Sequence, residues 1–154
     1  MPSINRRFRG VVKTLATALD DVPWALTGST SFALQGVPLT PNDVDVQTTE
    51  DGAYEIERRF AAQVVEPVSF AESASIRSHF GALEQDGVRV EIMGDVRKRR
   101  DGGTWGSPIE LAEHHEFVTV DGVRVPVLSL EYEADAYEKL GRTERAALLR
   151  EHAD

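Results

Sequence analysis

The sequence predicts an α/β protein in which a small mixed β-sheet is flanked by helices. Short β-type runs alternate with stretches of helical apolar spacing, and two Asp-Gly pairs mark hairpin turns. The 154 residues are enough for one domain with one sizeable core, and 41% of them are hydrophobic. We therefore expect a single domain over residues 1–154.

The first elements are a helix, a strand and a tight turn. Residues 4–19 place their apolar side chains at helical spacing, which predicts a helix that packs on the domain. Trp24–Thr27 is an apolar run of strand length. Gly28 then permits backbone angles that other residues resist, and Ser29 is expected to be the N-cap of a short helix.

The middle of the chain predicts another helix and the first hairpin. Thr49–Ala62 reads as a helix, which we expect to cross over to a parallel strand. Pro67 interrupts the next β-type run, so that strand is expected to be short or irregular. Around Asp86-Gly87, the stretches 76–85 and 88–93 read as the two strands of a hairpin.

The last third of the chain repeats the hairpin pattern and then turns helical. Asp121-Gly122 separates two further β-type runs. Ser129 is expected to cap a helix that continues to Leu140, and Gly141 ends it. Residues 143–152 predict a final helix.

Asp43 and Asp45 alternate with valines, and this pattern suggests chemistry. Residues two apart in a strand point to the same side, so both carboxylates would lie together while Val44 and Val46 enter the core. Adjacent carboxylates repel, and a divalent cation held by oxygen ligands, Mg²⁺ or Mn²⁺, is the usual reason for such a pair. The simpler alternative is a solvated strand face.

The Gly28-Ser29 turn, Gly36 and the Asp43-x-Asp45 pair together resemble the signature of the DNA polymerase β-like nucleotidyltransferase superfamily, in its small stand-alone form. The resemblance implies a nucleotidyltransferase fold and a third acidic residue on a later strand. Glu91 fits that position. Two alternatives stay open: a surface ion pair of Glu91 with Arg89, and Asp95 as the third carboxylate.

The resemblance also implies a reaction, which is Mg²⁺-dependent transfer of a nucleoside monophosphate from a nucleoside triphosphate such as ATP to a hydroxyl acceptor. Asp43, Asp45 and Glu91 would be the catalytic and metal-binding residues. Gly28 and Ser29 would bind phosphates at the helix end. Lys139 would approach the nucleotide from the helix that follows Ser129, although an exposed helix lysine is an equally good interpretation.

The composition limits the partners. Net charge is −9, with 26 acidic and 17 basic residues, of which only three are lysines. This balance disfavours a general nucleic-acid surface and is typical of either an ordinary acidic protein or one from a salt-loving organism. The chain has no cysteine, no membrane-length apolar run and no signal-type N-terminus, so we expect a cytoplasmic protein.

The acceptor is left open by the sequence. It could be a small molecule, such as a cationic antibiotic, or a partner protein, as in a toxin–antitoxin pair. Nucleotide binding without catalysis is a third hypothesis, and association of two copies of the chain is also left open. Arg97–Arg100 is a basic run that is either solvated or in contact with triphosphate or an anionic acceptor.

Overall fold

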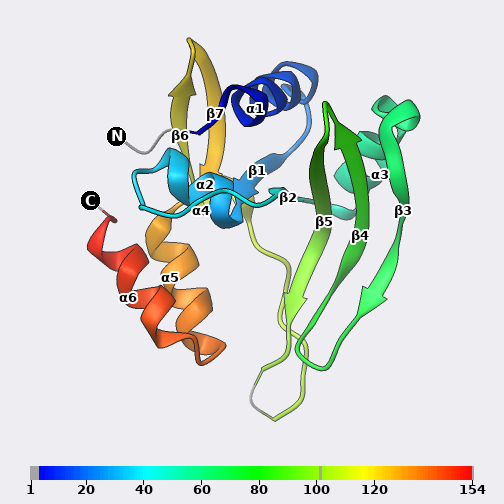
Figure 1. Cartoon of the computed structure of the whole chain (residues 1–154). Helices are drawn as coiled ribbons and strands as arrows, with labels where there is room; N and C mark the ends of the chain where they lie inside the picture. The colour runs from blue at the N-terminus through cyan, green and yellow to red at the C-terminus, as the bar shows by residue number, and fades with distance from the viewer. Residues whose placement is uncertain (1–3, 101, 154) are drawn as a thin grey trace.

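A computed structural model of the protein describes residues 4–100 and 102–153 and confirms the mixed α/β fold (Figure 1). A seven-stranded sheet has the order β3-β4-β5-β2-β1-β7-β6. Its strands are β1 (Trp24–Thr27), β2 (Val44–Thr48), β3 (Val64–Glu72), β4 (Ile76–Gln85), β5 (Val88–Lys98), β6 (His115–Val120) and β7 (Val123–Leu128). The helices are α1 (Arg6–Ala18), α2 (Gly28–Leu34), α3 (Glu50–Arg59), α4 (Leu111–His114), α5 (Leu130–Lys139) and α6 (Thr143–Glu151), and Ala61–Gln63 form one 3₁₀ turn.

The centre of the sheet combines parallel and antiparallel pairing. β1 is antiparallel to β2 and parallel to β7, and β2 is parallel to β5. The crossover to a parallel strand that was expected after the helix over Thr49–Ala62 is wrong. α3 leads instead to β3, which pairs only with β4 and is antiparallel to it. The parallel partner of β2 comes later because β3, β4 and β5 follow one another as antiparallel neighbours.

Both predicted hairpins are confirmed, as is the irregularity of β3. β4 pairs with β5 and β6 pairs with β7 across the two Asp-Gly turns. In β3 the pairing register shifts between Val64 and Glu66 and again between Glu66 and Ser69, and Pro67 lies within the second interval. The strand is nevertheless nine residues long, so it is irregular but not short.

The two largest buried clusters lie on different sides of the sheet. The larger one joins α1 and α3 to one face of the strands and includes Val44, Val46 and Val90, all fully buried. The second joins α2 to the C-terminal helices through Phe32, Leu130 and residues of α6. In Figure 1, α5 and α6 accordingly lie beside α2, apart from α1 and α3. The strand face opposite the larger cluster is the one that carries polar residues.

Helix starts follow short polar caps, with one correction. Ser129 caps α5 as expected, because its hydroxyl accepts a hydrogen bond from the Tyr132 N–H at 3.1 Å. Ser29 is not the cap of α2. Strand β1 runs directly into that helix, so Thr27 is the N-cap residue and Ser29 lies in the first turn. Among the described residues, no helix has the length and hydropathy needed to cross a membrane.

Candidate active site

The parallel pairing of β2 with β5 brings the predicted carboxylates together. Asp45 is the register partner of Glu91, so the two residues are neighbours across the sheet. Val44 and Val46 are fully buried in the larger cluster, which places Asp45 on the opposite face, where it also pairs with Thr27 of β1. Asp43 directly precedes the strand. The sequence therefore identified acidic residues that the fold does bring side by side.

Asp45 lies in a strongly perturbing electrostatic environment. Burial raises its pKa to about 7, and the nearby charges of Glu91 and Asp43 and a hydrogen bond with Glu91 act in the same direction. Only Arg89 opposes this rise. An acid that is this costly to ionise would be stabilised by a cation beside it. Because the possible metal ligands here are all carboxylate oxygens, the site suits Mg²⁺ or Mn²⁺.

The alternative ion pair of Glu91 is also present. Arg89 Nε donates to Glu91 Oε2 at 2.8 Å, and Arg89 Nη2 lies 3.5 Å from Glu66 Oε1. No ion pair of Asp43 or Asp45 is found in the described part of the chain. Likewise, over residues 4–100 and 102–153, no three acidic, histidine or cysteine side chains already form a metal-holding group. Glu91 is therefore shared between its acidic neighbour and Arg89.

Asp95 does not join this cluster. Its Oδ1 accepts a hydrogen bond from the Glu50 N–H at 3.1 Å, at the first residue of α3. Its backbone has a φ of 50°, in the left-handed region that few non-glycine residues adopt. The structure thus uses Asp95 at the start of a helix rather than beside Asp45.

The turn at Gly28 is built against Asp45. Gly28 has a φ of 74°, and a Cβ at this position would lie 2.3 Å from Asp45 Oδ2. Both the backbone angle and the close approach therefore require glycine. The next two residues fasten the start of the acidic strand: Thr30 Oγ1 donates to the Asp43 carbonyl at 2.8 Å, and the Asn42 N–H donates to Ser29 Oγ at 3.0 Å.

Glu133 is a residue of this neighbourhood that the sequence analysis missed. It is only 5% exposed, and its Oε2 accepts a hydrogen bond from Thr27 Oγ1 at 2.5 Å. A signal was available, because helical spacing puts Glu133 on the same face as the buried Leu130 and Ala134. An acid on the apolar face of a helix needs a partner in the folded protein.

Lys98 and Lys139 lie close to each other near α5. Lys139 is the last residue of α5 and is exposed. Lys98, at the end of β5, has its Nζ 5.5 Å from the centre of the Tyr132 ring. Burial lowers the pKa of Lys98, the charge of Lys139 lowers it further, and Glu133 opposes both effects. The nucleotide contact of Lys139 stays a prediction.

Two residues of the basic run, Arg97 and Arg99, make contacts within their own loop. The guanidinium carbons of Arg77 and Arg99 lie 4.6 and 5.7 Å from the centre of the Trp105 ring. Arg97 Nη1 donates to the Gly106 carbonyl at 3.4 Å. These contacts hold the loop after β5 in place, and they leave Lys98 as the member of the run that faces α5.

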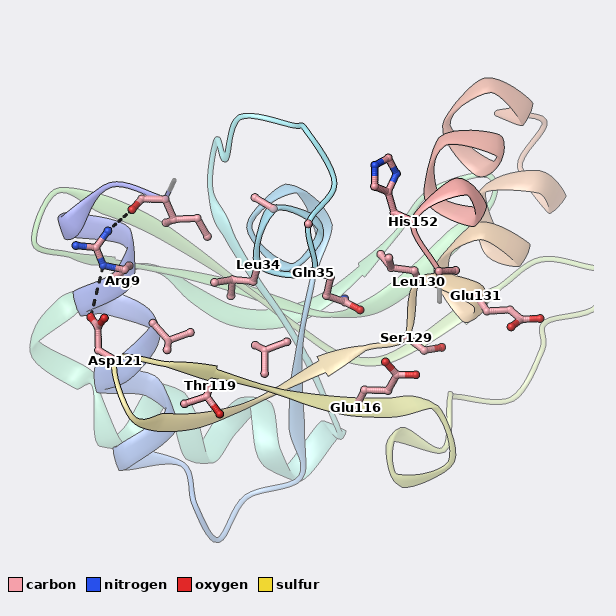
Figure 2. A pocket seen from close by; sticks show the side chains of 16 residues that line it. Arg9, Leu34, Gln35, Glu116, Thr119, Asp121, Ser129, Leu130, Glu131 and His152 are labelled. Carbon is pink, nitrogen blue, oxygen red and sulfur yellow. Dashed lines mark hydrogen bonds and ion pairs between the residues drawn. The ribbon is translucent and has the colours of Figure 1, made fainter. Parts of the chain in front are cut away.

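A separate cavity of about 940 Å³ lies at the other end of α2. Figure 2 shows Arg9 and Asp121 at one end of it, and Glu116, Ser129 and His152 toward the other. None of the three carboxylates of the candidate site lines this cavity. It is therefore distinct from the acidic cluster.

Comparison with known proteins agrees with this fold. A protein of Thermotoga maritima assigned as a nucleotidyltransferase has a similar structure, with 50% sequence identity and a TM-score of 0.87 over 97% of this chain and 94% of that one. The lincosamide antibiotic adenylyltransferase LnuA, solved with lincomycin, shares the fold at 9% identity and a TM-score of 0.59, covering 96% and 97% of the two chains.

The antibiotic-resistance factor ANT(2'')-Ia also shares the fold, at 13% identity and a TM-score of 0.53 over 94% of this chain and 82% of that one. No curated protein matches the sequence. The sequence model of aminoglycoside-2''-adenylyltransferases matches residues 10–153, which is nearly the whole chain. The protein therefore belongs to the aminoglycoside-2''-adenylyltransferase family and is a nucleotidyltransferase.

Proposed function

We propose that the protein transfers a nucleoside monophosphate, with ATP as the donor, to a hydroxyl group of a small-molecule acceptor in a Mg²⁺-dependent reaction. The observation that supports this proposal is the pairing of Asp45 with Glu91 beside the Gly28 turn, where burial and the charges of Glu91 and Asp43 raise the pKa of Asp45. Mg²⁺ bound there would activate the acceptor oxygen and neutralise charge on the triphosphate and leaving pyrophosphate.

We assign a different role in the reaction to each residue of the candidate site. Asp43 and Asp45 would hold the metal, and Glu91 would complete its ligand set or accept the proton of the acceptor hydroxyl. The first turn of α2, at Gly28 and Ser29, would receive phosphates through backbone N–H groups. The Ser29 hydroxyl accepts a hydrogen bond from Asn42, so its own hydrogen is available to donate.

The family supports an acceptor of the aminoglycoside class as the first to test. Such an acceptor carries several hydroxyl groups and positive charges, and a chain of net charge −9 would attract it. The Arg89–Glu91 ion pair would have to loosen when the metal binds, since Glu91 Oε2 now accepts from the guanidinium.

The test is incubation with α-labelled ATP, Mg²⁺ and a panel of aminoglycosides, followed by measurement of pyrophosphate release and of label in the acceptor. The double variant Asp43→Asn with Asp45→Asn should lose activity, and Asp20→Asn, at an exposed position, serves as the matched control. Equal turnover by the double variant and the wild type would overturn the proposed role of the carboxylates.

The contact between Arg89 and Glu91 supports a second candidate function, which is nucleotide binding without turnover. A guanidinium 2.8 Å from Glu91 competes with a metal for that carboxylate. Calorimetric binding of ATP without pyrophosphate release in any acceptor mixture would favour this candidate. Labelled product would exclude it.

A further inference from the structure

Glu133 is a buried acid whose contacts lead to the candidate site. It projects from α5 and is 5% exposed, whereas Glu131, two residues earlier on the same helix, is exposed. Moving a carboxylate out of water is costly unless hydrogen bonds and charges compensate it. The position of its partners therefore shows what the acid is used for.

Its partners lie in the turn between β1 and α2. Thr27 Oγ1 donates to Glu133 Oε2 at 2.5 Å across 106 residues of sequence. Thr27 is the N-cap residue of α2, but its hydroxyl makes no capping bond within that helix. The hydroxyl donates to Glu133 instead, on another helix. Burial raises the pKa of this carboxyl to about 7, and its contacts with Thr27 and the Gly28 backbone oppose that rise.

The same turn touches the catalytic carboxylate on its other side. Thr27 is the register partner of Asp45, and Gly28 lies against Asp45 Oδ2 so closely that no Cβ would fit. Glu133, the turn and Asp45 thus form one continuous row from α5 to β2. A shift of α5 would move the turn relative to the carboxylate that it faces.

We propose that Glu133 is a positioning residue, which holds the Thr27–Gly28 turn against Asp45 so that the first turn of α2 can receive the triphosphate. The role rests on the proposed function, because it has meaning only if a nucleoside triphosphate binds there. A glutamine at this position keeps the volume but removes the charge and replaces one acceptor oxygen with an NH₂ group, so the contact with the Thr27 hydroxyl is weakened.

The experiment compares Glu133→Gln, Thr27→Val and the double variant, with Glu131→Gln as the matched control. Mg²⁺ and ATP are titrated into each protein by calorimetry, which requires no acceptor, and Tm is measured alongside. Each single variant should weaken nucleotide binding about tenfold, as is usual when a residue that orients a ligand group is lost. The double variant should lose no more than either single variant, because both changes break the same contact.

A purely structural role gives a different pattern. In that case nucleotide affinity would change only in proportion to lost stability, and Glu133→Gln at unchanged Tm would bind as the wild type does. Thr27→Ser keeps the hydroxyl and should restore affinity. If the wild type binds ATP and Glu133→Gln binds equally well, the positioning role is wrong while the proposed function stands. If the wild type binds no nucleotide, both are overturned.

Discussion

Asp45→Asn should stabilise the metal-free protein at pH 8 while removing its activity. Burial and the neighbouring acids raise the pKa of Asp45 from 3.8 to about 7. The folded protein therefore holds this proton to higher pH than the unfolded chain does. Its stability falls as the pH rises from about 4 to about 7, and the full cost remains above that range.

The size of the effect follows from the pKa. A tenfold change in an acid dissociation constant corresponds to about 1.4 kcal/mol, so the ionised Asp45 costs at most about 4 kcal/mol. Asparagine removes that charge at nearly the same volume. For a domain of this size, each kcal/mol changes Tm by about 2–4 °C. The gain of Asp45→Asn over the wild type should be about 1.6 kcal/mol at pH 5 and reach its maximum near pH 8.

The assay is urea denaturation at pH 5 and pH 8, with and without Mg²⁺. Added Mg²⁺ should stabilise the wild type by about 2.7 kcal/mol at a hundredfold excess over its Kd and leave Asp45→Asn nearly unchanged. Asp20→Asn, at an exposed site, controls for a general loss of negative charge. A stability difference between wild type and Asp45→Asn that is the same at both pH values would refute the reasoning.

Three further substitutions test other parts of the structure. Gly28→Ala should abolish ATP binding because its Cβ would meet Asp45. Gly36→Ala is the control, since Gly36 also has a positive φ but no atom lies within 4 Å of the added Cβ, and it should retain binding in the same titration. Phe32→Ala should lower the free energy of unfolding by about 3–5 kcal/mol in urea, since its side chain is 1% exposed in the second cluster; a loss below 1 kcal/mol would contradict that packing. Arg89→Gln should tighten Mn²⁺ binding by releasing the neighbouring glutamate, and weaker binding in calorimetry would show that the arginine instead orients it.

Local patterns were sufficient to predict much of this fold. The alternation around Asp43 and Asp45, the glycine at position 28 and the two Asp-Gly turns each act within a few residues, and the structure confirms the elements they predict. The resemblance to a known signature then supplied Glu91, which the pairing of β2 with β5 places beside Asp45. What that group binds remains a prediction.

Long-range pairing was beyond the reach of these patterns. The partner of Glu133 lies 106 residues away, so no local spacing could connect it to Thr27. The order of the strands likewise depends on pairing between segments that are far apart in the sequence. The crossover expected after α3 was wrong for that reason. The cap of α2 was assigned to Ser29 because a good capping residue was near, although β1 continues directly into the helix.

The irregular pairing of β3 has a consequence for how molecules meet one another. β3 is an edge strand of the sheet, and Pro67 has no N–H that could form a hydrogen bond with an added strand. Its two register shifts also break the even ladder that a second chain would need for strand addition. Val65 and Phe70 are 56% and 55% exposed on this strand. Because regular pairing with a second chain is blocked, these exposed side chains do not make the edge a site of intermolecular β-sheet formation.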